Sequence, residues 1–400
     1  MKKTLFFLTC LWVMCDVCMA QDIFTAGYFY NASGIKSAAV FKNEEIVYER
    51  GELGEDNYSS AIVIDTVNDD IYWSCNTNPV NSISEGYGRV MKNNEVFLDN
   101  VQGTQINAIS LDGNDIYSAG FINDIYESKA AVWKNGEAIP LYTYGNMGKR
   151  SQILGLKVVD GVVYACGYYE DGFKYGCVWV NGELYASYPH NTVRDIDFYE
   201  GEIYYVVGDV ISFIYQSGQE LFELYNNHGT ANRVCDIKVV EGDVYSVGFM
   251  GFNDCFVWKN SAFLYIHTFA READLNACYS YRNSLYYVGW DHEDHGIIFK
   301  DGEQLYSQDA RIFYDVFVKS DPLAMGGESH EKPAIYPNPA RESVFIDGLE
   351  EGEMIGVFNM EGQLVRSVKA DSDRKIDVRG LPSGIYYVRC GYHVMRFVKE

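Results

Sequence analysis

Hydrophobic and polar positions alternate along most of the chain, in short runs that end at glycine or asparagine turns. The run 193–199 is followed by the turn Glu200-Gly201, and alternation resumes in 202–207, 211–216 and 220–225. A period of two predicts β-strands, because successive side chains of a strand point to opposite faces. Four strands joined by tight turns are therefore expected here. Tyrosine at 33 copies and phenylalanine at 22 also favour strands over helices.

This four-stranded unit recurs at intervals of about forty residues, the spacing of propeller blades. The turn between its third and fourth strands follows a large apolar residue, at 41–45, 91–95, 133–137, 179–183, 215–220, 258–262 and 299–303. An apolar residue followed by tyrosine marks the second strand at 71–72, 116–117, 163–164, 203–204, 244–245 and 285–286. A glycine follows this tyrosine by three residues in most copies, and Cys75 takes its place in one.

The two ends of the array share one unit. Residues 24–30, 37–42 and 45–49 match the second, third and fourth strands, whereas 314–318 matches a first strand that has no second strand after it. A unit split between the termini closes a ring and leaves no exposed sheet edge at the ends of the array. The sequence therefore predicts an all-β fold, a seven-bladed β-propeller over residues 22–319.

Most of the conspicuous aromatic and sulfur-containing residues are expected in the core. Trp133, Trp179 and Trp258 share one register with other large residues, which indicates packing between blades rather than a ligand platform. Cys166 and Cys177 flank the turn Asp171-Gly172 and could pair across a hairpin, but small apolar residues occupy the register of Cys166 elsewhere. We therefore favour a core position over a disulfide there.

Charge and the amino-terminal segment restrict the location of the protein. Lys2 and Lys3, an apolar run over 5–14 and the small residues before Gln21 predict a signal peptide over 1–20, cleaved between Ala20 and Gln21. The apolar run is too short to span a membrane. The formal net charge of −24 argues against nucleic acid as a partner, because phosphates are bound through clustered lysine and arginine.

The composition changes near residue 320. Proline and glycine over 320–333 indicate a linker, and short alternating segments over 334–400 predict a small β-sandwich of the immunoglobulin-like type. This tail contains Tyr336-Pro337-Asn338-Pro339 at its start, Gly384 and Tyr386 near its end, and Lys399 in a closing strand. With these motifs in this order, it resembles the type A carboxy-terminal sorting domain of type IX secretion cargo.

The resemblance implies a route and a partner. Such cargo crosses the inner membrane, passes the periplasm and the outer membrane of a Gram-negative bacterium by the type IX secretion machinery, and is then attached to the cell surface or released. The motif residues Tyr336, Pro337, Asn338, Pro339, Gly384, Tyr386 and Lys399 would belong to the sorting signal. We expect the folded protein to be monomeric, with no membrane span.

Two groups of residues are candidates for chemistry in the propeller. Asp195, Asp236 and Asp315 occupy one register in three innermost strands, and they would lie at or near the central channel. Carboxylates there could act as acid and base or bind a ligand, although a hydrogen bond that closes the strand end is the more economical interpretation. The loop containing Asp291, His292, Asp294 and His295 has side chains suited to a divalent metal.

No motif of a known propeller enzyme is present, and the sequence requires no cofactor. The favoured interpretation is an exported β-propeller that acts as a binding or scaffold module for a protein or glycan. The alternative is an extracellular hydrolase or lyase with its site at the mouth of the channel.

Overall fold

The computed structural model describes residues 21–51, 55–79, 86–99, 103–123, 127–141, 150–224, 232–251, 253–320, 335–346, 354–359, 364–369, 375–390 and 393–400. The chain divides into two compact units, residues 1–321 and 322–400. The predicted signal peptide and nearly all of the predicted linker lie outside the described residues. Strands make up all the regular structure of the described residues, and none of their segments forms a helix that could span a membrane.

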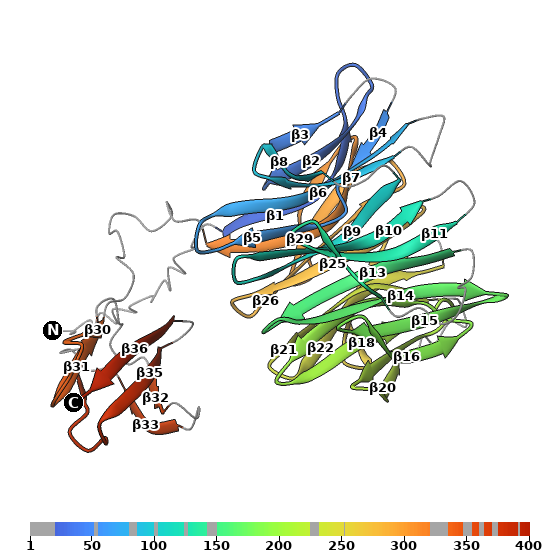
Figure 1. The fold of residues 1–400 in the computed structure, drawn as a ribbon. Helices are drawn as coiled ribbons and strands as arrows, with labels where there is room; N and C mark the ends of the chain where they lie inside the picture. The colour runs from blue at the N-terminus through green and yellow to red at the C-terminus, as the bar shows by residue number, and fades with distance from the viewer. Residues whose placement is uncertain are drawn as a thin grey trace, which may run out of the picture. The chain divides into compact units, whose positions relative to one another are not determined.

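The first unit is built from antiparallel sheets whose strands follow one another along the chain (Figure 1). Its innermost strands are β29 (Arg311–Ser320), β5 (Ile62–Asp65), β9 (Thr104–Asp112), β13 (Arg150–Val159), β17 (Val193–Tyr199), β21 (Asn232–Val240) and β25 (Ala273–Tyr281). The second strands are β1 (Gln21–Tyr30), β6 (Asp70–Pro79), β10 (Asp115–Asn123), β14 (Val162–Asp171), β18 (Glu202–Val207), β22 (Asp243–Met250) and β26 (Ser284–Asp291).

The two outer positions of each sheet are filled in the same chain order. The third strands are β2 (Lys36–Lys42), β7 (Tyr87–Lys92), β11 (Ser128–Lys134), β15 (Phe173–Val180), β19 (Ser212–Gln216), β23 (Asp254–Lys259) and β27 (Gly296–Lys300). The outermost strands are β3 (Glu45–Arg50), β8 (Glu95–Asp99), β12 (Glu137–Ile139), β16 (Glu183–Pro189), β20 (Gln219–Leu224), β24 (Ala262–Thr268) and β28 (Glu303–Gln308). An additional strand, β4 (Glu55–Tyr58), pairs with β6 beside β5.

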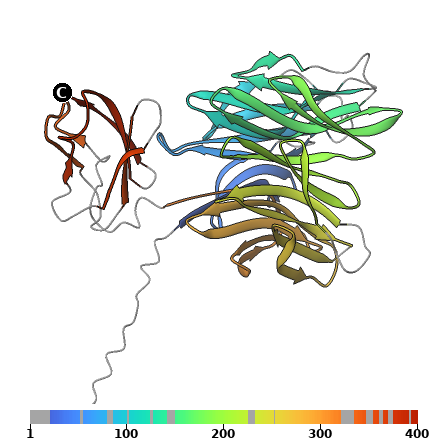
Figure 2. The ribbon, with the colours of Figure 1, turned by 90° about the horizontal axis from the view of Figure 1, so that it is seen from below.

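The ring closes through the two ends of this unit. β29 pairs antiparallel with β1, from Gln21 opposite Ser320 to Phe29 opposite Arg311, and completes the sheet β29-β1-β2-β3. The innermost strands contact one another in a cycle that runs β29, β5, β9, β13, β17, β21, β25 and back to β29. Seen from below, the sheets succeed one another around this cycle (Figure 2). The predicted all-β propeller is confirmed, and the described strands supply one innermost strand for each of the seven expected blades.

A bulge in the innermost strand explains the recurring glycine of the second strand. In β21 the register skips Cys235 between Val234 and Asp236, so the carbonyl oxygen of Arg233 approaches β22. A Cβ atom at Gly248 would lie 2.0 Å from that oxygen, so a side chain cannot fit. The other blades with this glycine have the same close approach, at Gly27, Gly120, Gly167 and Gly289. Where Cys75 replaces the glycine, the inner strand is instead interrupted between β4 and β5.

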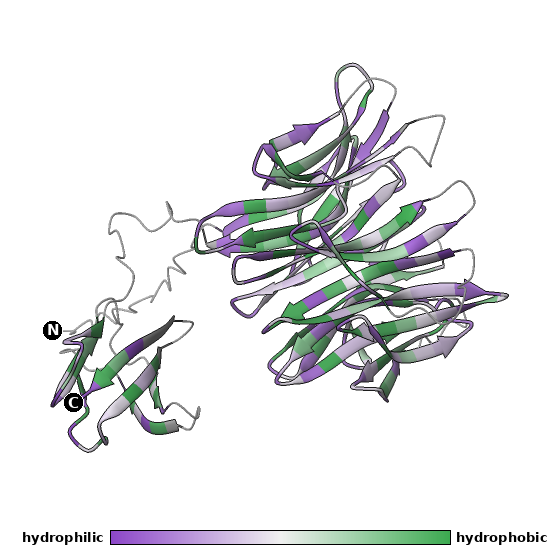
Figure 3. Cartoon of the chain, in the orientation of Figure 1, coloured by the Kyte–Doolittle hydropathy of each residue, from purple (hydrophilic) through white to green (hydrophobic). Residues whose placement is uncertain are grey.

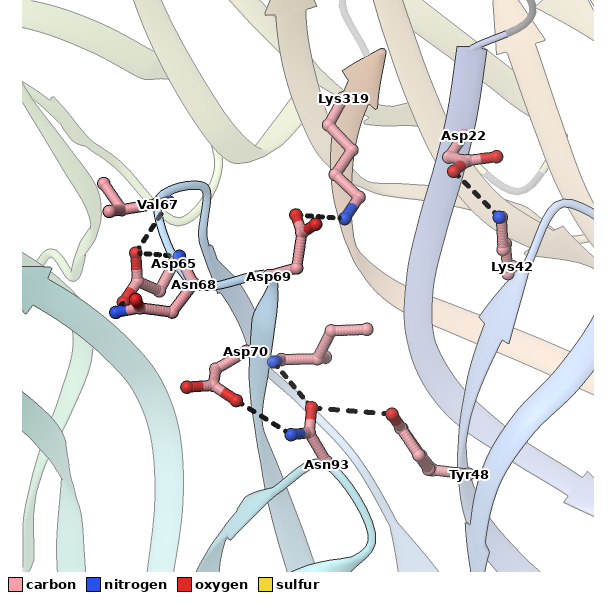
Figure 4. Close-up of polar contacts among 11 residues, drawn as sticks. Asp22, Lys42, Tyr48, Asp65, Val67, Asn68, Asp69, Asp70, Asn93 and Lys319 are labelled. Carbon is pink, nitrogen blue, oxygen red and sulfur yellow. Dashed lines mark hydrogen bonds and ion pairs between the residues drawn. The ribbon is translucent and has the colours of Figure 1, made fainter. Parts of the chain in front are cut away.

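The recurring polar turn joins three strands of its blade, through asparagine in five blades and through Ser217 or Asp301 in the other two. Asn93 has a positive φ of 54°, which suits a tight hairpin turn, and its Oδ1 accepts the N–H of Ile71 at 2.9 Å. Its amide nitrogen donates to Asp70, which also pairs with Lys92 at 2.8 Å. Figure 4 shows the hydrogen bond between Asn93 and Asp70 beside the Lys42–Asp22 pair of the neighbouring blade. Such shared contacts stabilise the blade rather than form a site.

The hydrophobic residues of the repeat lie between the sheets. Figure 3 shows apolar and polar residues alternating along the strands, as the sequence pattern requires. Trp179 and Trp258 are buried, and Trp133 is nearly so, which agrees with the packing role expected for them. Cys166 lies opposite Val178 rather than Cys177, and both thiols are free and buried. These residues therefore hold neighbouring blades together.

The second unit is a small β-sandwich. One sheet contains β30 (Ile335–Tyr336), β31 (Ser343–Ile346) and β34 (Lys375–Asp377), and the other contains β33 (Leu364–Lys369), β32 (Met354–Phe358), β35 (Gly384–Cys390) and β36 (His393–Lys399). Both sheets contribute to one core, with Val344 and Ile346 from the first and Val357, Val388 and Phe397 from the second. The sandwich predicted for this segment is confirmed.

Candidate functional site

The innermost strands surround a cavity of about 510 Å³ along the centre of the propeller. Three positions of these strands line it, the second directly after the first and the third two residues after the second. We name them by their order from the start of the strand. The first ring is Ser60, Asn107, Leu154, Arg194, Cys235, Asn276 and Tyr314. The second ring is Ala61, Ala108, Asp195, Asp236, Ala277 and Asp315. The third ring is Val63, Ser110, Lys157, Asp197, Lys238, Tyr279 and Phe317.

The three predicted aspartates line this channel and also join neighbouring blades. Each carboxylate accepts a backbone N–H from the innermost strand of the next blade. Asp195 accepts from Ile237 at 3.1 Å, Asp236 from Cys278 at 2.6 Å and Asp315 from Ile62 at 2.8 Å. The three aspartates therefore have the hydrogen-bonding role that the sequence favoured.

Other blades make the same connection with a different residue, one position earlier. Asn107 donates from Nδ2 to the carbonyl oxygen of Ile153, and Asn276 donates to that of Phe313, both at 2.7 Å. These donors sit at the bulged position, so they reach a carbonyl oxygen where aspartate reaches an N–H. Five blades thus have either an amide in the first ring or a carboxylate in the second, and both fix one blade against the next. In the blade of β5, Ser60 Oγ donates to the carbonyl oxygen of Ile106 instead.

The charges in the channel are strongly coupled. Burial and the neighbouring charge of Asp236 raise the pKa of Asp195 well above its usual range. Burial also raises the pKa of Asp315 to about 6. Burial alone would lower the pKa of Lys238, but Asp236, Asp197 and Asp195 outweigh it and raise that pKa well above the usual value. In the third ring Lys157 pairs with Asp197 at 2.8 Å. The channel therefore holds a carboxyl group with a raised pKa next to other carboxyl groups and two lysine side chains.

Replacing Asp195 with asparagine should make the stability of the propeller less dependent on pH. A carboxyl whose pKa is raised by folding contributes fully below the ordinary carboxyl pKa, and its contribution is lost as the pH rises through the folded value. Asparagine keeps an oxygen for the N–H of Ile237 but carries no charge. As the pH rises from 4.5 to 8, the free energy of unfolding of Asp195→Asn should therefore increase relative to that of the wild type by about 1 kcal/mol or more. Thermal unfolding at the two pH values measures this.

The control for this prediction is Asp243→Asn in the next blade. Hydrogen bonds from Lys259 and Asn260 lower the pKa of Asp243, so its contribution is present at neutral pH and is lost as the pH falls. Because that change falls below the ordinary carboxyl pKa, the stability of Asp243→Asn relative to the wild type should stay nearly constant between pH 4.5 and pH 8. Equal pH profiles for the two variants would contradict the assignment of a raised pKa to Asp195.

The loop that contains the predicted metal ligands forms a turn held by its own hydrogen bonds. Asp291 Oδ1 accepts the N–H groups of Glu293 and His295, and its Oδ2 lies 3.1 Å from His295 Nδ1. The other ring nitrogen of His295 lies 3.2 Å from Asp309. Within the part of the chain that the structure describes, no group of three or more His, Cys, Asp or Glu side chains is placed to hold a metal ion. The hypothesis that Asp291, His292, Asp294 and His295 bind a metal gains no support from this geometry.

In the second unit, the separate sorting motifs meet at the closing strand β36. Gly384 lies opposite Lys399, and Tyr386 lies opposite Phe397 with its ring stacked on it at 5.6 Å. Asn338 accepts the N–H of Val398 at 2.9 Å through Oδ1 and donates to the carbonyl oxygen of Arg396. The amide of Asn338 thus fixes the Tyr-Pro-Asn-Pro segment to β36.

The outer surface of the motif is open to solvent. Tyr336 is 46% exposed and stacks on Phe345, whereas Lys399 is buried and donates to the backbone oxygen of Glu400. Pro337 and Pro339 are exposed beside Asn338. The predicted sorting residues therefore form one connected structure, although they are spread over more than sixty residues of sequence.

Comparison with known proteins identifies this second unit. Residues 334–398 match the family described as the secretion system C-terminal sorting domain. No curated protein matches the chain. Solved structures with a similar fold include the WD40 β-propeller domain of Doa1, with 12% identity over 77% of this chain and 96% of that chain and a TM-score of 0.41.

Two further structures cover most of this chain. One is the C-terminal WD40 domain of Sif2, with 11% identity over 94% of this chain and 92% of that chain and a TM-score of 0.41. The other is PorZ, a surface component of the type IX secretion system of Porphyromonas gingivalis, with 10% identity over 94% of this chain and 86% of that chain and a TM-score of 0.21. These TM-scores are low, so the fold assignment rests on the strand pairing described above. Because the sorting motifs form one connected unit and that unit matches the family, the chain consists of a β-propeller followed by a C-terminal sorting domain, which supports delivery by the type IX secretion system.

Proposed function

We propose that this protein is a binding module that acts outside the cell. It would travel through the periplasm, act at the outer surface or after release as a monomer, and bind a protein or glycan without a cofactor. The observation that carries this proposal is the channel of about 510 Å³, which is lined by polar groups on rigid strands. Binding sites for small ligands have volumes of roughly 300–1,000 Å³ and a few polar groups in fixed positions.

The cross-blade hydrogen bonds support binding by such a channel. Asp236 and Asn276 are each held by a backbone group of the next blade, so their positions are set before any ligand enters. Preorganised polar groups lose little conformational entropy on binding, which favours affinity. The same bonds occupy one oxygen or the amide nitrogen of these side chains, and this reduces what they can contribute to proton transfer.

One observation favours a catalytic alternative. Burial and the neighbouring charge of Asp236 raise the pKa of Asp195 well above its usual range, and a carboxyl group with a raised pKa beside a second carboxyl group can act as a general acid. A hydrolase or lyase acting on an extracellular polysaccharide or peptide would use this pair. Binding and turnover must therefore be measured together.

The test uses the mature chain, residues 21–400, immobilised and exposed to surface polysaccharide and surface protein from the producing bacterium. We expect saturable binding of one of these, with no new reducing ends or peptide termini after prolonged incubation. An unrelated cargo with a sorting domain of the same family controls for binding by the tail. Absence of binding would contradict the proposed function, and turnover that is lost in Asp236→Asn would establish the catalytic alternative.

A further inference from the structure

The channel has two unlike walls in its third ring. Tyr279, Phe317 and Val63 come from three successive blades and make one side aromatic and apolar. Lys157, Asp197 and Lys238 come from three other successive blades and make the opposite side charged. A ligand that fits must therefore present an apolar face to one wall and hydrogen-bonding groups to the other.

The aromatic wall offers a stacking surface. The rings of Tyr279 and Phe317 lie 4.8 Å apart with an angle of 40° between their planes. The face of an aromatic ring carries partial negative charge, so it attracts the slightly positive C–H groups of a saturated ring. Burial raises the pKa of Tyr279 to about 12, so its hydroxyl keeps its proton and can donate a hydrogen bond.

The charged wall contains a donor that is not committed to another side chain. Lys157 pairs with Asp197 at 2.8 Å, whereas Lys238 forms no ion pair with any of the described residues. Its ammonium group stays charged in the field of the surrounding carboxylates and can donate to a ligand hydroxyl. In the first ring, Asn107 and Asn276 each use Nδ2 for the next blade, which leaves Oδ1 as an acceptor.

We propose that the channel binds a neutral sugar residue, with the face of the sugar ring on Phe317 and Tyr279 and its hydroxyl groups towards Lys238. This inference rests on the proposed binding function and assigns it a ligand class and a place. Ala61 and Ala108 leave the second ring wide on one side, so the cavity has room for a sugar ring and surrounding water. The carboxyl groups of Asp197, Asp236 and Asp315 would disfavour an acidic sugar.

The experiment measures dissociation constants of the mature chain for glucose, galactose, mannose, N-acetylglucosamine and glucuronic acid by titration calorimetry and ligand-observed NMR. Phe317→Leu removes the aromatic face but keeps an apolar side chain, and Lys238→Met removes the ammonium but keeps the length. Their controls are Phe222→Leu and Lys259→Met, which lie away from the channel. Thermal unfolding checks that every variant is folded.

At least one neutral sugar should bind, glucuronic acid should bind more weakly, and each channel variant should weaken binding at least tenfold while the controls leave it unchanged. If either channel variant fails to fold, contacts between sugar C–H protons and selectively labelled phenylalanine rings of the wild type give the same information. The proposal would be overturned if no sugar bound at 10 mM, which is about tenfold above the dissociation constant of a weak site. Equal binding by the channel variants and the controls would also overturn it. Retained binding to surface polysaccharide or protein would then show that the proposed binding function stands without a sugar site in the channel.

Discussion

Removing residues 311–319 should abolish cooperative folding of the propeller at 37 °C. The deleted segment is most of β29, which buries Ile312, Phe313, Val316 and Val318 between the first and last blades. Loss of a buried large apolar side chain costs about 2–5 kcal/mol, so the loss of four costs roughly as much as the whole stability of a typical domain, about 5–15 kcal/mol. The loss also leaves β1 without a partner along one edge. Scanning calorimetry of the mature chain measures the result.

The matched control is removal of residues 334–400. The propeller and the sandwich are separate compact units, so this larger deletion should leave the unfolding temperature of the propeller unchanged. If the 311–319 deletion melted like the wild type, closure of the ring by β29 would be wrong. The pair of deletions separates an effect of lost length from an effect of lost closure.

Removing residues 334–400 should instead stop export. The family match and the connected motif around Asn338 place the sorting signal in this unit. The shortened protein would still carry residues 1–20, and we expect it to cross the inner membrane and accumulate in the periplasm. Fractionation of the producing bacterium should show the protein in the periplasm and little of it at the surface or in the medium.

A finer variant tests the structural basis of that signal. Asn338→Ala removes both bonds that join the Tyr-Pro-Asn-Pro segment to β36, whereas Arg341→Ala removes only an exposed ion pair with Glu400. Asn338→Ala should reduce export, and Arg341→Ala should leave it unchanged. Wild-type surface levels of the 334–400 deletion would contradict the assignment of the sorting signal to this unit.

Much of the fold could be predicted from the sequence because the repeat sets both spacing and register. The expected strands over 193–199 and 202–207 coincide with β17 and β18. The split first unit predicted the pairing of β29 with β1, although β1 begins three residues earlier than the pattern indicated. The additional strand β4 was not predicted, because it has no counterpart in the other units and its pairing with β6 depends on the interruption before β5.

The candidate site was only partly visible in the sequence. A shared register placed Asp195, Asp236 and Asp315 at the channel, but their hydrogen-bond partners lie about forty residues away or at the other end of the chain. Lys238 and Phe317 were missed because their register holds valine, serine, lysine, aspartate and aromatic residues in different blades. The signal that could have found them is their spacing, two residues after the aspartate position in each strand.

The closed ring is tested most directly by amide hydrogen exchange on the intact mature chain. The β29–β1 pair joins residues almost 300 positions apart, and every inference about the channel depends on it. If the ring is closed, the amides that β1 and β29 donate to each other should exchange as slowly as those of β17 and β18, because all of them open only on global unfolding. Fast exchange in β1 and β29 with slow exchange in β17 and β18 would contradict the closed propeller.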